Sequence, residues 1–144
     1  MKIPRSIGFE VKCVSNLIKR NLDEEYIKRD MHDLTGMQGW ILKFINANSN
    51  KDIFQKDIEK EFRIRRSTAT GMLQLLEKNG YIKRESVESD ARLKKLVLTP
   101  KAIIAIEELE NILIEFNKHL HEGISEEEKE IFFAIVDKVK KNLD

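Results

Sequence analysis

Hydrophobic side chains recur every three or four residues in long stretches near both ends of the chain, the spacing of an amphipathic helix. The stretches with this pattern are residues 7–29, 35–47, 100–120 and 125–143. Thr35 with Gln38, and Ser125 with Glu128, have the spacing of a capping box, so we expect helices to begin at these two pairs. In the second stretch, the expected core stripe is Trp40, Ile41, Phe44 and Ile45. In the third, the residues that recur on one apolar stripe are Ile103, Ile106, Leu109, Leu113, Phe116 and Leu120.

The elements expected in the middle of the chain are shorter. A short helix is predicted from about Asp52, a suitable N-cap residue, with Ile58 and Phe62 directed inward. After a turn at residues 63–64, a second helix is predicted, ending in a left-handed cap at Gly80. Its apolar face comprises Ala69, Met72, Leu73 and Leu76.

Two short strands follow Gly80. The first has strand-forming residues at Tyr81, Ile82 and Val87, and the second is the segment LKKLVLT, residues 93–99. The polar segment ESDAR, residues 88–92, separates them, and a loop longer than two residues would let the hairpin project. The fold class is therefore mainly α with a small β-wing, in which a helix-turn-helix is followed by a two-stranded hairpin.

The second helix of this helix-turn-helix begins with residues that stabilise a helix poorly. Two positive charges, three hydroxyls and a glycine are crowded into one or two turns. A helix that enters the major groove of DNA needs a slim, donor-rich N-terminal part, because that part contacts the bases and phosphates. The helix residues expected to contact DNA are Arg65, Arg66, Ser67, Thr68, Thr70 and Gln74. The wing adds Arg92, Lys94 and Lys95, and an arginine at a hairpin tip can enter the minor groove.

Charge is distributed unevenly along the 144 residues, although the net charge is only +1. Residues 51–99 carry 12 basic and 8 acidic side chains, whereas residues 100–144 carry 6 basic and 11 acidic ones. The basic segment coincides with the helix-turn-helix and the wing, as expected of a nucleic-acid interface. The length fits one ordinary domain, and no apolar run reaches the roughly 20 residues of a membrane span.

One cysteine, Cys13, excludes an internal disulfide and fits a reducing compartment, and no signal peptide is evident, so we expect a cytoplasmic protein without membrane contact. His119 and His121 are two residues apart, which directs them to different faces of a helix and argues against a metal site. No phosphate loop or catalytic triad signature is present. We therefore expect no catalytic residues, no metal and no cofactor.

These residues resemble a known family in several places at once. DLTGMQGWILKFI resembles the second helix of the MarR family of bacterial transcriptional regulators, and RRSTATGMLQLLEKNGYIKRE resembles that family's recognition helix. ESDARLKKLVLTPKA resembles its wing signature, a D-x-R motif followed by V-x-L-T. The resemblance implies that Arg92 reaches the minor groove and that Asp90 helps to orient it. The resemblance extends over essentially the whole length of the chain.

Three positions depart from the family pattern. The family often has Asp or Ser as a helix cap where Arg65 stands, arginine where Gly71 stands, and glycine where Ala102 stands. The first two departures leave the fold expectation intact, but they make the preferred DNA sequence uncertain.

The resemblance also implies an organisation and a mechanism. Residues 7–33 and 100–144 would form a helical dimerisation region, and residues 35–99 a winged helix-turn-helix lobe that binds double-stranded DNA. The implied function is a homodimeric repressor of a palindromic operator, released by a small-molecule effector. An apolar or aromatic effector would contact Cys13, Asn16, Met37 and Trp40.

Three alternatives remain open at this point. The near-neutral total charge and the glycine at position 71 also fit a winged-helix protein-interaction module that has no operator. Cys13 could make the protein a redox-responsive regulator, provided that its thiol is accessible and has a lowered pKa. Finally, a regulator without an effector would be controlled by its abundance alone. Met37 and Trp40 would then be core residues.

Overall fold

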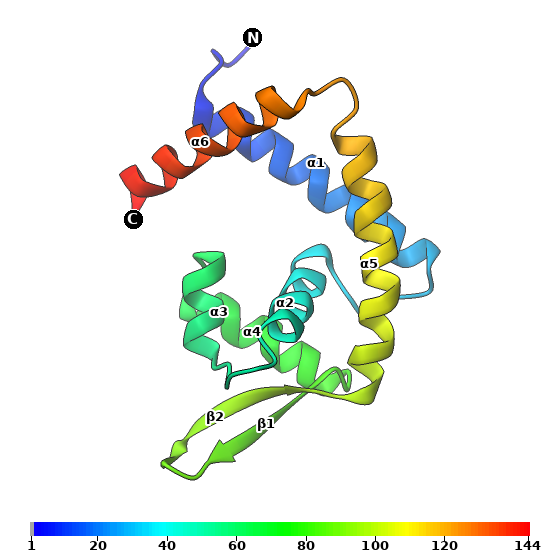
Figure 1. The fold of residues 1–144 in the computed structure, drawn as a ribbon, viewed down its shortest axis with the longest axis vertical. Coiled ribbons are helices and arrows are strands. Elements are labelled where there is room, and N and C mark those ends of the chain that lie inside the picture. The colour runs from blue at the N-terminus through cyan, green and yellow to red at the C-terminus, as the bar shows by residue number, and fades with distance from the viewer. Residues whose placement is uncertain (1) are drawn as a thin grey trace. The chain divides into compact units, whose positions relative to one another are not determined.

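The computed structural model describes residues 2–144, which form helices and one two-stranded antiparallel sheet (Figure 1). In chain order the elements are α1 (Ile7–Lys28), α2 (Gly36–Ala47), α3 (Gln55–Phe62), α4 (Arg66–Lys78), β1 (Ile82–Val87), β2 (Asp90–Leu98), α5 (Pro100–Leu120) and α6 (Glu126–Leu143). This order confirms the predicted helix-turn-helix and wing. The chain divides into two compact units, of which the first ends at Ile112 and the second comprises Leu113–Asp144.

The core of the first unit forms where the second half of α1 packs against α2. Leu22 and Tyr26 of α1 are fully buried, and Gly36 of α2 lies so close to Leu22 that an added Cβ would be 3.3 Å from its side chain. The predicted capping box begins α2, since the Thr35 amide donates to Gln38 Oε1 at 3.0 Å. The box fixes where α2 starts, and the apolar residues of α2 decide which of its faces packs inward.

The expected inward stripe of α2 was only partly correct. Ile41 and Ile45 are buried, but Trp40 is 36% exposed, so the assignment of Trp40 to the core was wrong. Leu42, which the expected stripe omitted, is fully buried instead. The helix is buried over a wider arc than the stripe assumed, and Trp40 lies at its edge.

The helix-turn-helix consists of α3 and α4, joined by a three-residue turn. The prediction that α3 begins near Asp52 was wrong: the helix begins at Gln55, and Asp57 accepts a hydrogen bond from the Phe54 amide at 2.8 Å. Residues 52–54 stay outside the helix, and the Ile53 carbonyl accepts a hydrogen bond from the Leu96 amide of β2 at 2.7 Å. Helix α4 buries Ala69, Leu73 and Leu76 as expected, with Met72 half-buried.

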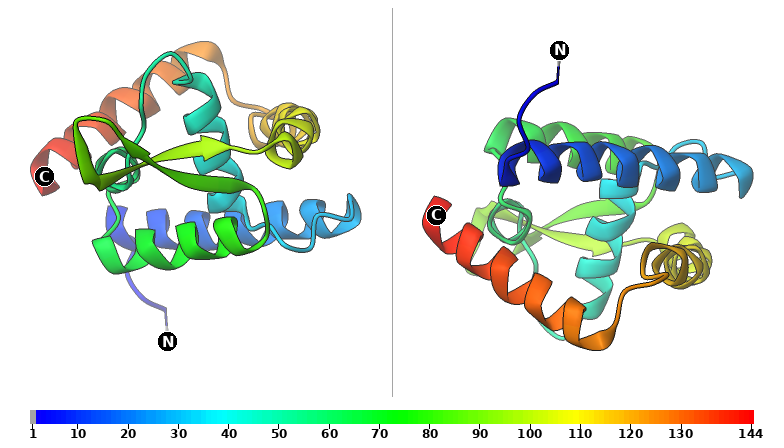
Figure 2. Two further views of the ribbon diagram at one scale, coloured as in Figure 1. Left: turned by 90° about the horizontal axis from the view of Figure 1, so that it is seen from below. Right: turned by 90° about the horizontal axis from the view of Figure 1, so that it is seen from above.

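The hairpin of β1 and β2 extends beyond the helices of its unit and is strongly twisted (Figures 1 and 2). Glu88 and Ser89 alone connect the two strands, so the expectation of a longer loop was wrong. The extra residues form a bulge instead, because Ser86 pairs with Lys94 while the next residue, Val87, pairs with Asp90. Residues 91–93 are thereby left out of the ladder, and the wing tip bends where they lie.

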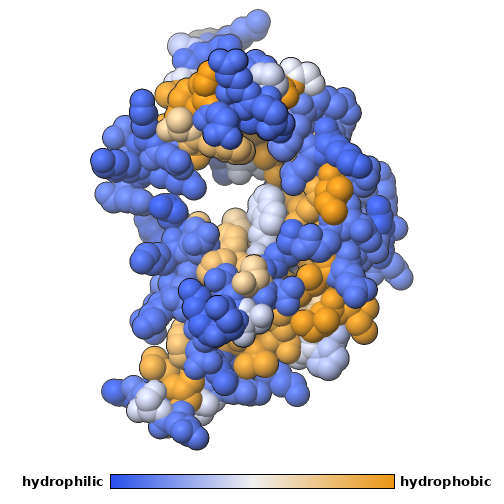
Figure 3. All heavy atoms as spheres, viewed as in Figure 1, coloured by the Kyte–Doolittle hydropathy of each residue, from blue (hydrophilic) through white to orange (hydrophobic). Residues whose placement is uncertain are grey.

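Helix α5 begins at Pro100, as predicted. Its buried residues are Ala102, Ile106, Leu109, Ile112 and Leu113, whereas Ile103 of the same apolar stripe is 47% exposed. In the second unit, α6 begins with the predicted capping box, in which the Ser125 amide donates to Glu128 Oε1 at 2.9 Å. No residue of α6 is buried, and hydrophobic side chains are visible at the surface over this helix (Figure 3). No helix within residues 2–144 has the length and apolarity needed to cross a bilayer.

Candidate nucleic-acid interface

The N-terminus of α4 is an uncapped basic helix start. Arg65 occupies the N-cap position in extended conformation, and its side chain makes no capping hydrogen bond. The amides of the first turn therefore remain available to an external acceptor, and the helix dipole favours a negatively charged one. Arg65, Arg66, Ser67 and Thr68 are all exposed around this terminus. The structure thus collects two cationic side chains, two hydroxyls and a set of amide donors at one end of one helix.

Thr70 and Gln74 differ in their surroundings. Gln74 is exposed on α4, one turn beyond Thr70. Thr70 is half-buried, and its Oγ1 accepts a hydrogen bond from Gln55 Nε2 at 2.9 Å. The same Gln55 nitrogen also lies 3.4 Å from the Arg66 carbonyl oxygen. Gln55 therefore holds the start of α3 to the start of α4, a role for which its sequence position gave no signal.

At the wing tip, Asp90 holds Arg92 in a defined orientation. The Arg92 amide donates to Asp90 Oδ1 at 2.9 Å, and its guanidinium donates to both carboxylate oxygens, at 3.2 Å to Oδ1 and 3.3 Å to Oδ2. The side-chain and backbone hydrogen bonds from Arg92 lower the pKa of Asp90 below its usual range, so the carboxylate stays charged. The Arg92 side chain is nevertheless 90% exposed. The pair therefore orients an arginine without burying it.

The two wing lysines have different partners. Lys94 is exposed, and its Nζ donates to Ser86 Oγ at 2.5 Å across the hairpin. Lys95 is half-buried, and its Nζ lies 3.7 Å from Asp52 Oδ1. The charge of Lys95 is thus partly balanced by a carboxylate, whereas no carboxylate among residues 2–144 pairs with Lys94. Lys94 is therefore the more accessible of the two cations.

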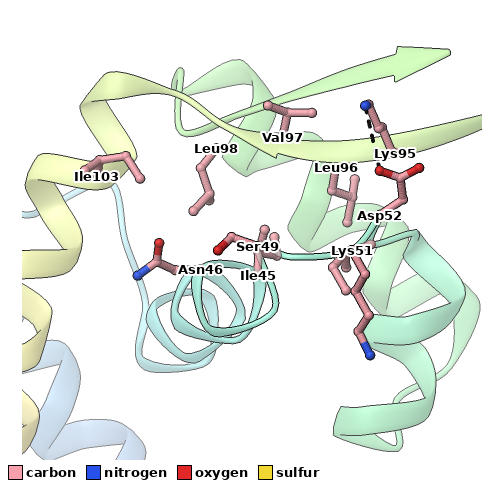
Figure 4. Close-up of a pocket in the computed structure, with 11 residues that line it drawn as sticks. Ile45, Asn46, Ser49, Lys51, Asp52, Lys95, Leu96, Val97, Leu98 and Ile103 are labelled. Atoms are coloured by element: carbon pink, nitrogen blue, oxygen red, sulfur yellow. Dashed lines mark ion pairs between the residues drawn. The ribbon is translucent and has the colours of Figure 1, made fainter. Parts of the chain in front are cut away.

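The residues expected at an effector site lie on two helices of the first unit. Cys13 and Asn16 belong to α1, and Met37 and Trp40 belong to α2. Cys13 and Met37 are half-buried, while Asn16 and Trp40 are exposed. A pocket of about 280 Å³ in the same unit lies elsewhere, between the end of α2, segment 49–53, β2 and the start of α5 (Figure 4). None of the four residues lines this pocket.

A helix-turn-helix whose second helix begins with exposed arginines, followed by a hairpin with an exposed, oriented arginine, defines the class of winged-helix DNA-binding proteins. A family model, described as the MarR family, matches residues 32–93. The structure of the transcription regulator MarR from Oenococcus oeni PSU-1 is 30% identical, with a TM-score of 0.78, and the match covers 94% of this chain and 99% of that one.

Two structures of MepR from S. aureus are also similar, each at 26% identity. The MepR–DNA complex gives a TM-score of 0.84, with 96% of this chain and 97% of that chain covered. MepR in its DNA-binding conformation gives a TM-score of 0.81, and the match covers 97% of this chain and 100% of that one. The chain therefore belongs to the MarR family of winged-helix transcription regulators.

Proposed function

We propose that this protein is a sequence-specific DNA-binding repressor that acts as a homodimer. The observation that carries the proposal is the pairing of two exposed basic elements in one unit: the uncapped start of α4 and the Arg92 side chain that Asp90 orients. Helix α4 would enter the major groove, with Arg66 and the hydroxyls of Ser67 and Thr68 at the bases or phosphates. Arg92 would enter the neighbouring minor groove, whose negative potential attracts a guanidinium group.

The remaining candidate residues would contribute differently. Arg65 and Lys94 are exposed and would contact phosphates, and Gln74 is exposed further along α4. Thr70 is the weakest of the helix candidates, because its hydroxyl is already bonded to Gln55. Lys95 would add general positive potential more than a direct contact, because Asp52 lies beside it.

Dimerisation is supported by apolar side chains that one chain leaves exposed. On α1, Val11, Val14 and Leu17 are each about half exposed, and so are Phe132 and Ile135 on α6. Burial of such side chains is favourable by roughly 25 cal/mol for each Å² removed from water. A second copy of the chain that covers these helices would place two recognition helices about one DNA turn apart, as a palindromic operator requires. Residues 7–33 and 100–144 would then serve dimerisation, and residues 35–99 DNA binding.

An effector would act on this dimer by releasing it from DNA. Trp40 supports an effector site beside α1 and α2, because its large ring is 36% exposed although neighbouring residues of α2 are buried. A small apolar or aromatic molecule would stack on Trp40 and contact Met37, Cys13 and Asn16. The test is a thermal-shift screen of wild type and Trp40→Ala against aromatic molecules, followed by release of bound DNA; a hit that shifts both variants equally would argue against this location.

The experiment that tests the DNA-binding mode uses fragments selected from genomic DNA and binding measured by fluorescence anisotropy at physiological salt. We expect Arg66→Ala and Arg92→Ala each to weaken binding by about 1–3 kcal/mol. Lys78→Ala is the matched control, because Lys78 is an exposed cation at the opposite end of α4. Unchanged binding in both arginine variants would exclude the proposed mode. If no fragment were retained above non-specific levels, a protein-interaction module would be the better explanation.

A further inference from the structure

Three segments that are distant in the chain meet where α4 ends and β1 begins. Asp33 lies between α1 and α2, Tyr81 lies between α4 and β1, and Lys101 lies in the first turn of α5. The Tyr81 hydroxyl donates to Asp33 Oδ1 at 2.7 Å, and Lys101 Nζ donates to Asp33 Oδ2 at 3.1 Å. Each oxygen of one carboxylate therefore accepts a hydrogen bond from a different element of the fold.

Lys101 also contacts the last residues of α4. Its Nζ donates to the backbone carbonyl of Asn79 at 2.6 Å, and the same nitrogen lies 4.3 Å from the centre of the Tyr81 ring. A cation at this end of a helix interacts favourably with the helix dipole, and a cation over an aromatic face gains a further attraction. Asn79 Nδ2 in turn lies 3.4 Å from the Asp33 carbonyl oxygen. Hydrogen bonds thus connect Asp33, Asn79, Tyr81 and Lys101, and a cation–π contact adds a second link between Lys101 and Tyr81.

Gly80 lies between Asn79 and Tyr81 of this cluster, and a glycine at this position gives the connection between α4 and the wing conformational freedom. Its φ of 81° lies in the left-handed region, where glycine is accommodated without steric cost. Its carbonyl accepts a hydrogen bond from Thr99 Oγ1 at 2.6 Å, and the Thr99 amide donates to the Tyr81 carbonyl at 3.1 Å. The chain at and immediately after this glycine is thus held by Thr99, the residue before α5.

Burial and charge both favour a persistent cluster. Tyr81 is only 3% exposed, so its hydroxyl needs the partner that Asp33 supplies. Partial burial raises the pKa of Asp33, but hydrogen bonds from Tyr81 and Lys101 outweigh it, and the pKa of Asp33 falls below its ordinary value. The carboxylate is therefore charged at neutral pH, and charge-assisted hydrogen bonds are stronger than neutral ones.

We propose that Asp33, Tyr81 and Lys101 form a joint that fixes the direction in which the wing leaves the recognition helix, so that α4 and Arg92 bind one DNA site at the same time. The proposal rests on the DNA-binding function proposed above. Helix α4 and the wing share the short connection of residues 79–81, so a small rotation there displaces the wing tip far more than the helix. The three residues are positioning residues, and none of them needs to touch DNA.

The first test measures how much Arg92→Ala weakens DNA binding in wild type and in a variant that lacks the joint. In wild type we expect Arg92→Ala to weaken DNA binding at least fivefold. In Asp33→Asn or Lys101→Met, the orientation of the wing relative to α4 is no longer fixed. Arg92→Ala should therefore weaken DNA binding less than about twofold in these backgrounds. The cost of Arg66→Ala should be unchanged, because α4 keeps its own packing. An equal cost of Arg92→Ala in both backgrounds would overturn the proposal.

The second test does not depend on DNA. In Asp33→Asn, hydrogen exchange of the amides in residues 82–98 should accelerate about tenfold, while exchange in the buried half of α4 stays as in wild type. Tyr81→Phe, which removes one hydrogen bond and keeps the ring, should give a smaller acceleration and serves where Asp33→Asn folds poorly. Unchanged exchange in the wing of both variants would refute the joint.

Lys43→Met is the matched control for both tests. It removes a lysine that pairs with Glu110 at 3.3 Å elsewhere in the same unit, and it should leave both readouts unchanged. If wild type bound no DNA sequence specifically, the proposed function would fail while the exchange measurement still decided whether the joint holds the wing.

Discussion

The hydroxyl of Tyr26 lies beside Gly39 at the place where any other residue would put its Cβ atom. A Cβ at position 39 would come within 3.1 Å of Tyr26 Cζ and closer still to the hydroxyl oxygen. The hydroxyl is buried and has no hydrogen-bond partner within residues 2–144. Burial is the main cause that raises the pKa of Tyr26 to about 12, with the nearby Asp23 adding to it. The contact between α1 and α2 is thus close enough to exclude even a methyl group.

This contact predicts opposite effects for two substitutions. Gly39→Ala should lower the free energy of unfolding by about 1–3 kcal/mol through overpacking. Tyr26→Phe should be neutral or stabilising by up to about 1 kcal/mol, because it removes a buried hydroxyl that lacks a partner. Urea denaturation of both variants and of the double variant measures these effects. Gly39→Ala should cost less in the Tyr26→Phe background, and an equal cost would show that the hydroxyl is not what position 39 avoids.

Gly71 gives a second prediction. It is exposed on α4, and an added Cβ would meet nothing within 4 Å. Gly71→Ala should therefore stabilise the free protein by about 0.5–1 kcal/mol, since glycine weakens a helix interior. Gly71→Arg should be folded equally well and should shift operator preference in a selection from random DNA. If Gly71→Arg selected the wild-type sequences, position 71 would face away from DNA.

Asp33 gives a prediction about pH. Its folded-state pKa is lower than its ordinary value of 3.8, so it contributes stability above that pH and loses the contribution as pH falls through the folded-state pKa. Wild type should therefore lose melting temperature more steeply than Asp33→Asn as the pH falls below the ordinary pKa of 3.8 and through the lower folded-state pKa. Asp90 and Glu128 also have lowered pKa values, but both variants contain them, so the difference isolates Asp33. Parallel curves for the two variants would contradict the prediction.

The two wing lysines should differ in their effect on salt dependence. Each phosphate neutralised by a cation contributes a slope of about −0.9 to the plot of log affinity against log salt. Lys94→Ala should reduce the magnitude of this slope by about 1, whereas Lys95→Ala should reduce it less, because Asp52 already lies near Lys95. Binding isotherms at several salt concentrations measure both. Equal changes would mean that the Lys95–Asp52 pair opens on DNA.

The proposed dimer predicts a change in mass on substitution of α6. Phe132 is 59% exposed, and placing a charge there by Phe132→Asp should give a monomer at micromolar concentration, as measured by sedimentation velocity. Leu75→Asp is the control, because Leu75 is exposed to a similar extent, 50%, but belongs to α4. A wild-type protein that sediments as a monomer at all concentrations would remove the basis of the proposal.

Local signals in the sequence were enough to predict the order of the elements. Capping boxes at Thr35 and Ser125, the left-handed Gly80 and the apolar spacing of α4 each depend on residues a few positions apart, and all were confirmed. The predicted start of α3 was wrong because the Ile53 carbonyl is hydrogen-bonded to the Leu96 amide of β2, which holds this residue outside the helix. The spacing of residues along the chain does not predict a hydrogen-bond partner more than 40 residues away.

Contacts between residues distant in the sequence could not be predicted at the candidate site either. Arg66 and Arg92 could be chosen from residue type and position, and both are exposed. The hydrogen bond between Gln55 and Thr70, and the cluster around Asp33, join residues 15 to 68 positions apart, so only the folded chain brings them together. Trp40 was assigned to the core by periodicity alone, which does not tell a buried face from its edge.

The bulge in the wing separates the tip residues, which include Arg92, from the paired residues that hold the hairpin together and pack inward. Residues 91–93 stand outside the ladder, while pairing from Ile82 with Leu98 to Ser86 with Lys94 continues without interruption. In a regular ladder, one inserted residue would turn every later side chain to the opposite face. Here the tip that carries Arg92 can lengthen, shorten or change its residues while Leu96 remains directed inward. A lineage of such regulators could thus acquire new operators by altering the wing tip alone, with the hydrophobic core unaffected.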